Sequence, residues 1–390
     1  MSGPVGVVLE CAHYDRFECR SCTWLERPYD AQLAAKDDTT RSLIGAALGD
    51  RRAPSWLPPV ASAPAGFRTK AKMVVGGTAA APSLGLWDPE RGAVDLRDCA
   101  LHSAGIVAAL PVLAAFVTRA ALAPYDVPTR SGELKHVLVT ESPDGQLMVR
   151  WVLRSTEAAT RIRKHLPWLL DALPSLRVVT LNIQPVHAAL LEGARELVLT
   201  EQASLPMRVN DLTLHLGPRS FFQTNTAVAA ALYRTAQDWV AEIAPATVHD
   251  LYCGVGGFAL HLAAPGRRVT GIEISPDAVA AAERGREDAG LSPDAVRFVA
   301  ADATSYLLDE PADLVVVNPP RRGLGTELAG RLEESGGRWI LYSSCNPQTL
   351  ARDLEVMRSY APLRAQVLDM FPQTAHLEVL VLLQRLPVFD

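Results

Sequence analysis

The segment Ser343-Ser344-Cys345-Asn346-Pro347 places a cysteine directly after a short apolar run. Such a cysteine is either a small buried apolar residue, which is the commoner case, or a nucleophile at the end of a strand. A thiolate can add to C6 of a pyrimidine ring, and the resulting enolate is then a carbon nucleophile at C5. Covalent catalysis of this kind divides one difficult alkylation into two easier steps. Cys345 is therefore a candidate nucleophile if a methyl donor lies beside it.

The same chemistry needs a base, because the ring adduct must lose its C5 proton before the thiolate can leave. The segment Thr374-Ala-His-Leu-Glu378 precedes the last apolar run of the chain, residues 379–383. His376 and Glu378 are two residues apart and can point to the same side of a strand. A carboxylate in an apolar setting can be tuned toward a neutral pKa. The competing interpretation is a solvent-facing pair at a strand edge.

A glycine-rich segment, Asp250-Leu-Tyr-Cys-Gly-Val-Gly-Gly-Phe258, joins an apolar run to a helical pattern. Glycines such as Gly254 let the backbone turn tightly and approach a ligand. Glu273 follows 23 residues after Asp250, at the end of the next predicted strand, where a carboxylate can accept hydrogen bonds from ribose hydroxyls. Asp302 follows the third strand and suits the adenine side of a nucleoside, although a helix cap explains it equally well.

Two features favour S-adenosylmethionine over a nicotinamide dinucleotide as the cofactor. The glycine turn lacks the third glycine of the pyrophosphate-binding fingerprint. The fourth predicted strand ends in Asn318-Pro319-Pro320, a rigid turn that presents a polar side chain and a carbonyl. Arg321 follows, where methyltransferases that act on amino groups have an aromatic residue, so amino-nitrogen methylation is disfavoured.

Four of the six cysteines form a separate group in the amino-terminal quarter, with the spacing Cys11-x7-Cys19-x2-Cys22 followed by Cys99. A Cys-x2-Cys pair can hold one metal centre, and a distant fourth thiolate can complete it. Tetrahedral zinc and a [4Fe–4S] cluster both fit this spacing.

The elements that must position these residues follow two patterns. After about residue 209, apolar runs at 247–251, 268–274, 296–299, 314–317 and 339–342 are interspersed with helical stretches at 276–289 and 349–360. This alternation predicts an α/β domain with a Rossmann-like, doubly wound parallel sheet, whose ligands lie at the carboxyl ends of the strands. Residues 67–200 instead predict a mixed α+β region, with strands at 136–140, 147–153 and 178–183. A helix is expected at about 30–48.

Length and charge agree with two domains. A chain of 390 residues is too long for one compact core, and we expect domains at 1–205 and 206–390, with residues 25–55 as a segment that can pack on the second. Residues 1–200 carry 22 Lys and Arg against 20 Asp and Glu, whereas residues 201–390 carry 16 against 23. Phosphate contacts are therefore expected in the amino-terminal part, first at Arg68, Lys70 and Lys72. No secretory signal or membrane-length apolar stretch is visible, which predicts a cytoplasmic protein with reduced thiols.

These motifs together resemble the RNA 5-methyluridine methyltransferase family, and most closely its type that acts on bacterial 23S ribosomal RNA. The resemblance extends over nearly the whole chain. It rests on the cysteine spacing and the motifs at residues 67–75, 182–187, 220–225, 250–258, 271–274, 318–323, 343–346 and 369–379.

The resemblance implies that Cys345 is the nucleophile, that Glu378 is the general base, and that Gln223, Tyr252, Glu273 and Asn318 bind S-adenosylmethionine. It also implies that the four amino-terminal cysteines hold a [4Fe–4S] cluster in an iron–sulfur and RNA-binding domain. The expected activity is methylation of C5 of a 23S rRNA uridine; the sequence does not show the oligomeric state, and a monomer is the default expectation. Two alternatives stay open: the same chemistry on tRNA or on more than one rRNA uridine, and a non-enzymatic iron–sulfur RNA-binding protein.

Overall fold

The carboxy-terminal half of the chain is built on a large mixed sheet. The computed structural model describes residues 6, 8–188, 190–306 and 312–387. Within these residues the sheet has eight strands in the order β1-β16-β17-β15-β14-β11-β12-β13. The strands are β1 (Ser55–Trp56), β11 (Thr247–Leu251), β12 (Arg268–Glu273), β13 (Val296–Ala300), β14 (Leu314–Val317), β15 (Trp339–Ser344), β16 (Tyr360–Leu368) and β17 (Glu378–Arg385).

Both faces of this sheet are covered by helices, as the predicted α/β architecture requires. Successive residues of a strand point to opposite faces. Accordingly, Val316 of β14 belongs to the core beneath one layer of helices, and Val317 belongs to the core beneath the other. The helices are α5 (Thr226–Ile243), α6 (Gly257–His261), α7 (Pro276–Asp288), α8 (Ala303–Tyr306), α9 (Gly325–Glu334) and α10 (Pro347–Val356).

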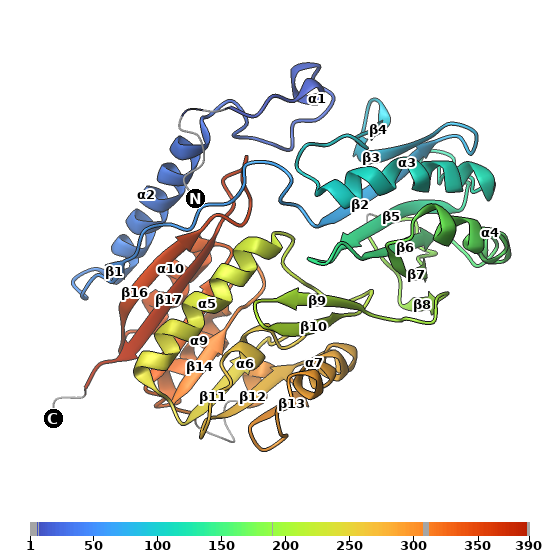
Figure 1. Ribbon diagram of the computed structural model, residues 1–390. Helices are drawn as coiled ribbons and strands as arrows, with labels where there is room; N and C mark the ends of the chain where they lie inside the picture. The colour runs from blue at the N-terminus through green and yellow to red at the C-terminus, as the bar shows by residue number, and fades with distance from the viewer. Residues whose placement is uncertain (1–5, 7, 189, 307–311, 388–390) are drawn as a thin grey trace.

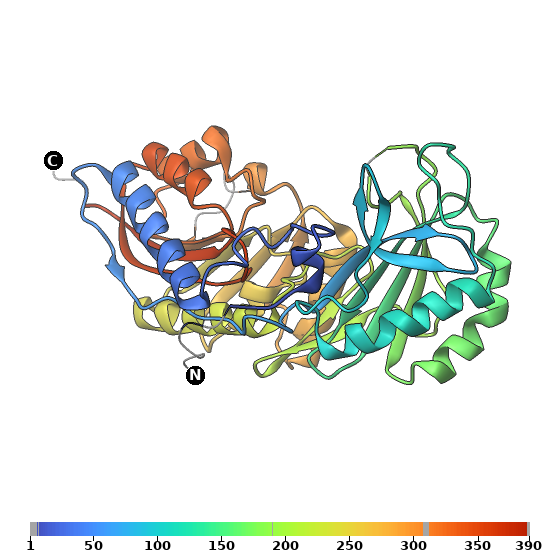
Figure 2. The same ribbon diagram turned by 90° about the horizontal axis from the view of Figure 1, so that it is seen from above.

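The amino-terminal half forms a second lobe around its own sheet (Figure 1). Among the described residues, seven strands follow the order β4-β3-β2-β5-β6-β7-β8. They are β2 (Lys70–Gly77), β3 (Pro82–Asp88), β4 (Gly92–Asp95), β5 (Leu134–Glu141), β6 (Leu147–Leu153), β7 (Leu176–Ile183) and β8 (Arg195–Val198). Helices α3 (Ala104–Arg119) and α4 (Ala159–Ala172) share one apolar core with this sheet and cover one of its faces. Figure 2 shows the two lobes side by side.

The segments at the start of the chain join the two lobes. The short helix α1 (Ala12–Asp15) lies beside the amino-terminal lobe, where His13 binds Asp98 with an Nε2–Oδ1 distance of 2.7 Å. Helix α2 (Tyr29–Leu48) packs against α10 of the other lobe, and β1 adds to the edge of the large sheet by pairing with β16 (Figure 1). A hairpin of β9 (Leu205–Val209) and β10 (Leu212–Leu216) connects the lobes further along the chain.

The carboxy-terminal lobe differs from the sequence prediction in two places. The helix expected at 349–360 ends at Val356, because Tyr360 already pairs with Arg385 as the first residue of β16. Apolar side chains at Leu350, Leu354 and Met357 continue a helical spacing up to that point, which explains the error. The sheet is also not wholly parallel, since β17 runs antiparallel to both β15 and β16. In the described residues, no helix is both long and apolar enough to cross a membrane.

Candidate active site

Cys345 and Glu378 meet at one edge of the large sheet. Cys345 directly follows β15, and Glu378 is the first residue of β17. Because these two strands are antiparallel, the end of one lies beside the start of the other. Ser344 pairs with Val379, so the register places Glu378 opposite Cys345. Two residues that are 33 positions apart in the chain are thereby neighbours at the carboxyl end of the parallel strands.

Glu378 is a buried carboxyl group with a single hydrogen-bond partner in the structure. Its side chain is 0% exposed, and Ser343 Oγ donates a hydrogen bond to its Oε1 atom. Among the described residues, the Oε2 atom has no hydrogen-bond partner. Burial raises the pKa of Glu378 to about 7, although the Ser343 hydrogen bond opposes this rise. A carboxyl group with a pKa near neutrality can take up a proton and release it again under physiological conditions.

Cys345 is half-buried at the surface of the same site. Burial raises the pKa of its thiol, the nearby Glu378 carboxyl raises it further, and Arg321 lowers it. Ionised Glu378 and a Cys345 thiolate therefore disfavour one another, whereas the guanidinium of Arg321 favours the thiolate. A positive charge near Cys345 would favour its thiolate form, which is the reactive one, and the sulfonium of a bound cofactor would supply such a charge.

The glycine turn and Glu273 form a second polar group on the same sheet edge. Gly254 N donates to Glu273 Oε2 at 3.1 Å, and Ser275 N donates to Oε1 at 3.0 Å. Both carboxylate oxygens are held by backbone amides, so the carboxylate is fixed against the turn. A carboxylate oxygen accepts more than one hydrogen bond, which leaves capacity for ribose hydroxyls.

The backbone of this turn is held in an unusual conformation. Gly254 has a φ of +55°, and Tyr252 has a φ of +62°, which is rare for a residue with a side chain. Backbone strain of this kind is found preferentially at functional sites. Asp250 lies beneath the turn with 0% exposure, and its Oδ2 accepts from Ala259 N at 2.8 Å.

The other predicted cofactor residues lie around this turn in different settings. Asn318 is half-buried directly after β14, and Gln223 is 7% exposed in the loop before α5. Asp302 follows β13 and caps the short helix α8, because its Oδ1 accepts from Thr304 N at 3.0 Å and Ser305 N at 3.1 Å. Asp302 is therefore a helix cap, as one of its two interpretations predicted, and its contact with adenine stays a prediction.

The two candidate bases have different environments. We expected His376 and Glu378 to point to the same side of one strand. The strand β17 begins only at Glu378, and His376 lies before it in an exposed position. Its Nδ1 accepts a hydrogen bond from Arg321 Nη2 at 3.2 Å, and burial and Arg321 lower its pKa. Of the two groups, Glu378 is the one with a neutral-range pKa that faces Cys345.

The four amino-terminal cysteines are brought together away from this site. Cys11, Cys19, Cys22 and Cys99 line one small cavity of about 30 Å³, along with leucine side chains such as Leu25. In the described part of the chain, no three His, Cys, Asp or Glu side chains are gathered so that they could hold a metal ion. The thiols thus surround a shared apolar cavity without converging on one point.

Sequence reasoning missed two residues that shape the active site. Ser343 donates a hydrogen bond to Glu378, and its place two residues before Cys345 in the cysteine motif is the only sequence signal for this role. Lys36 lies in α2 and binds Asp369 and the carbonyl of Phe371, close to the segment that leads into β17. A lysine within a helical pattern gives no sequence signal for such a role.

Comparison with known proteins identifies the family. Residues 294–386 match the model of the tRNA (Uracil-5-)-methyltransferase family, and residues 248–321 match a methyltransferase domain. A 23S rRNA (uracil(747)-C(5))-methyltransferase RlmC of Pectobacterium carotovorum is 48% identical over 380 residues, covering 97% of this chain and 100% of that protein. The chain belongs to the RlmC family.

Further comparisons agree with this family and with the fold. The RlmC protein of Escherichia coli O6:H1 is 47% identical over 378 residues, covering 96% of this chain and 99% of its own length. The crystal structure of Pyrococcus abyssi tRNA (uracil-54, C5)-methyltransferase in complex with S-adenosyl-L-homocysteine matches with a TM-score of 0.74 at 24% identity. The match covers 93% of this chain and 85% of the Pyrococcus abyssi chain. The fold is thus that of an S-adenosylmethionine-dependent methyltransferase.

Proposed function

We propose that this chain transfers a methyl group from S-adenosylmethionine to C5 of a uridine in 23S rRNA, at the position equivalent to uracil 747 of its relatives. The observation that carries the mechanism is the placement of Glu378 opposite Cys345. C5 of uracil is too weak a nucleophile to accept a methyl group directly, and this pair supplies a nucleophile and a base.

The reaction follows from the positions of these two side chains. The Cys345 sulfur bonds to C6 of uracil, and the electrons of the C5–C6 double bond move into the ring as an enolate. S-adenosylmethionine supplies an electrophilic methyl group to C5 and leaves as S-adenosylhomocysteine. Glu378 then takes the remaining C5 proton, the double bond re-forms, and the thiolate leaves C6. The Cys345–C6 bond is thus made and broken again, and the enzyme returns to its starting state when Glu378 gives its proton to water.

The cofactor is proposed to lie along the carboxyl ends of β11, β12 and β14. Glu273, whose two oxygens accept from the backbone amides of Gly254 and Ser275, is proposed to accept hydrogen bonds from the ribose hydroxyls as well. Tyr252 and Gly254 form the turn that the cofactor would contact, with Gln223 and Asn318 beside it. Among the described residues, the cap hydrogen bonds of Asp302 use Oδ1, and we propose that Oδ2 serves the adenine side.

We also propose that Cys11, Cys19, Cys22 and Cys99 hold a [4Fe–4S] cluster. The resemblance of the cysteine spacing to that of the family implies iron rather than zinc, and the four thiols line one small cavity, as ligands of a common centre would. The role proposed for the cluster is structural. Trp24 N, two residues after Cys22, donates to Gln373 O at 3.0 Å, so the cysteine region is connected to the segment that precedes Glu378.

The function is tested by mapping 5-methyluridine in ribosomal and transfer RNA from cells with and without the gene. The expected result is loss of one 5-methyluridine in 23S rRNA, restored by the wild-type gene and not by the Cys345→Ala variant. If 23S rRNA is unchanged and a tRNA loses the modification instead, the chemistry stands and the proposed substrate is wrong. If no 5-methyluridine changes, the proposed activity is wrong.

A further inference from the structure

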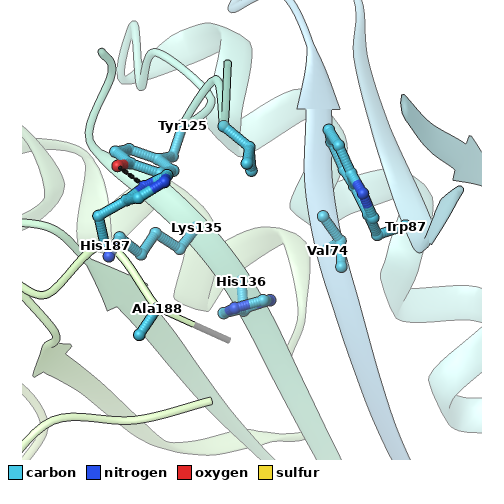
Figure 3. A pocket seen from close by; sticks show the side chains of 8 residues that line it. Val74, Trp87, Tyr125, Lys135, His136, His187 and Ala188 are labelled. Atoms are coloured by element: carbon cyan, nitrogen blue, oxygen red, sulfur yellow. Dashed lines mark hydrogen bonds between the residues drawn. The ribbon is translucent and has the colours of Figure 1, made fainter. Parts of the chain in front are cut away.

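A cavity of about 330 Å³ lies in the amino-terminal lobe, away from Cys345 and from the four clustered cysteines. Its walls are mainly aromatic and aliphatic. In Figure 3, Tyr125, His187 and Lys135 stand on one side, Trp87 and Val74 stand on the other, and His136 lies between them. This volume is at the lower end of the range of about 300–1,000 Å³ that small-ligand sites occupy.

The cavity lies on the face of the sheet that α3 and α4 leave open. Met73 and Val75 of β2 point into the core beneath these helices, so Val74 points to the opposite face. Val74 pairs with His136 of β5, which places both residues on the cavity side. A large partner would therefore approach the cavity on this face, because α3 and α4 cover the other one.

Three of the side chains that line the cavity, those of Tyr125, Lys135 and His187, are held in place by contacts with one another and with the backbone. Tyr125 Oη and His187 Nδ1 are 2.9 Å apart, and the Lys135 ammonium lies 4.6 Å from the centre of the Tyr125 ring. Lys135 Nζ also donates to Val186 O at 2.8 Å, so its charge is turned toward the protein. A flat ring that enters the cavity would meet walls that are already ordered, which lowers the entropic cost of binding.

The chemistry of these walls suits a neutral aromatic ring. Trp87 is 42% exposed, an unusual position for a large indole, and it is not part of the apolar core formed by the described residues of this lobe. None of the described residues that line the cavity is acidic. Burial and Lys135 lower the pKa of His136 to about 4, so its imidazole is uncharged at neutral pH and can hydrogen-bond to the edge of a heterocycle.

A strip of lysines connects the cavity to the catalytic lobe. Lys70 and Lys72 alternate with buried Ala71 and Met73, so they lie on the same face of β2 as Val74. The strip begins at Thr69, whose backbone N donates to Thr224 O, the residue after Gln223. Val74 lies five positions after Thr69, which is roughly 17 Å of extended chain at about 3.3 Å per residue. A few nucleotides of single-stranded RNA cover that distance.

We propose that this cavity binds an unpaired base of the substrate RNA, whose backbone follows Lys70 and Lys72 toward the catalytic lobe; this inference rests on the proposed function. Single-stranded RNA is recognised through bases that are splayed out and stacked on aromatic side chains. The base in the cavity is distinct from the uridine at Cys345. It fixes the register of the strand, so the cavity acts in recognition and takes no part in methyl transfer.

The experiment compares Trp87→Ala and His187→Ala with wild type, with Trp168→Ala as the matched control. Trp168 lies on α4, which covers the other face of the same sheet. The substrate is a protein-free transcript of the 23S rRNA region that contains the target uridine. Binding of this transcript and the KM and kcat of methyl transfer are measured separately. Both cavity variants should raise the RNA Kd and KM about tenfold, as loss of one base–aromatic stack does, with kcat at saturating RNA unchanged. Trp168→Ala should leave both constants near wild type.

The possible outcomes separate this inference from the proposed function. If the wild type methylates the transcript and both cavity variants bind and react like wild type, the cavity does not bind RNA and the function stands. If the variants fail only on ribosomal particles and not on the transcript, the cavity contacts protein and the inference is overturned. If the wild type does not methylate the transcript, the proposed function fails, and transcript binding alone decides: weaker binding by both variants supports the cavity, and unchanged binding overturns it.

Discussion

Lys36 and Asp369 form an ion pair that is closed off from solvent, with Nζ 2.5 Å from Oδ1. Both side chains are 0% exposed. Lys36 belongs to α2, near the start of the chain, and Asp369 directly follows β16. The same ammonium donates to Phe371 O at 3.0 Å. One lysine therefore holds the segment that runs from β16 to the candidate base, Glu378.

Breaking this pair should destabilise the protein strongly. Asp369→Ala leaves a buried ammonium without its partner, and the expected loss in the free energy of unfolding is about 3–5 kcal/mol. Replacing both residues together, as Lys36→Met with Asp369→Leu, should recover most of that loss, because no charge is then buried. Urea denaturation measures the effect. Glu242→Ala, which breaks the exposed pair with Arg364, is the control and should stay close to wild type.

The reaction should slow as the pH falls through about 7. Glu378 accepts the C5 proton only when it is ionised, and burial raises its pKa to about 7. Ser343→Ala removes the hydrogen bond that lowers this pKa, so the acidic limb of the profile should move to higher pH. Single-turnover product release at saturating RNA and cofactor measures both profiles. An acidic limb that does not move in Ser343→Ala would argue against Glu378 as the titrating group.

The same pKa predicts a stability effect that needs no substrate. The pKa of Glu378 is higher in the folded protein than its ordinary value of 4.5, so its contribution to stability is fully present below pH 4.5 and is lost as the pH rises through about 7. Glu378→Gln keeps an acceptor for Ser343 and cannot ionise. It should therefore be more stable than wild type at pH 8 by up to about 3 kcal/mol. Thermal unfolding at pH 5 and pH 8 checks the difference, which should shrink at the lower pH.

Glu378→Gln should also trap a covalent complex with RNA. Methyl transfer can proceed in this variant, but the C5 proton cannot leave, so the Cys345–C6 bond persists. A denaturing gel should then show a protein–RNA band that carries label from the methyl group of the cofactor. The double variant Cys345→Ala, Glu378→Gln is the matched control and should give no band. Normal turnover by Glu378→Gln would move the role of base to His376 or to water.

Protein purified without oxygen should contain about four irons and be brown, as ligation by four thiolates implies. Cys22→Ser should lose the iron and loosen the segment around Gln373, since Trp24 N binds Gln373 O. Hydrogen exchange of residues 369–377, measured without RNA or cofactor, reports that change. One bound zinc and no iron would show that the metal prediction is wrong.

Neutralising Lys70 and Lys72 should weaken RNA binding. The slope of the logarithm of the binding constant against the logarithm of the salt concentration should become shallower by about one to two, because fewer counterions are released. Burial and Lys72 lower the pKa of Lys70 to about 8, so Lys70 is still mainly charged at pH 7. Filter binding at several salt concentrations measures the slope, and the affinity for S-adenosylmethionine should not change. An unchanged slope would place the RNA elsewhere on the chain, with Arg321 and Arg322 as the next candidates.

The local features of the site could be predicted because they are contiguous in the chain. The strand that ends before Cys345, the glycine turn at Gly254 and the carboxylate at the end of β12 each depend on a few neighbouring residues. Parallel strands then bring their carboxyl ends to one edge, which is a general property of such sheets. For these reasons the α/β fold of the carboxy-terminal half, and the edge on which its motifs lie, were accessible from the residues alone.

What only the tertiary structure decided is how distant segments meet. β17 inserts antiparallel between β15 and β16, and this places Glu378 opposite Cys345 with its side chain fully buried. The pKa of Glu378 depends on that burial, which no spacing in the sequence expresses. Two further features depend on distant segments in the same way. Lys36 binds Asp369 and Phe371, and the cavity around Trp87 is lined by residues from several strands and loops. Long-range packing sets these environments, because the energy of a buried charge or an exposed ring depends on what surrounds it and not on its neighbours in the chain.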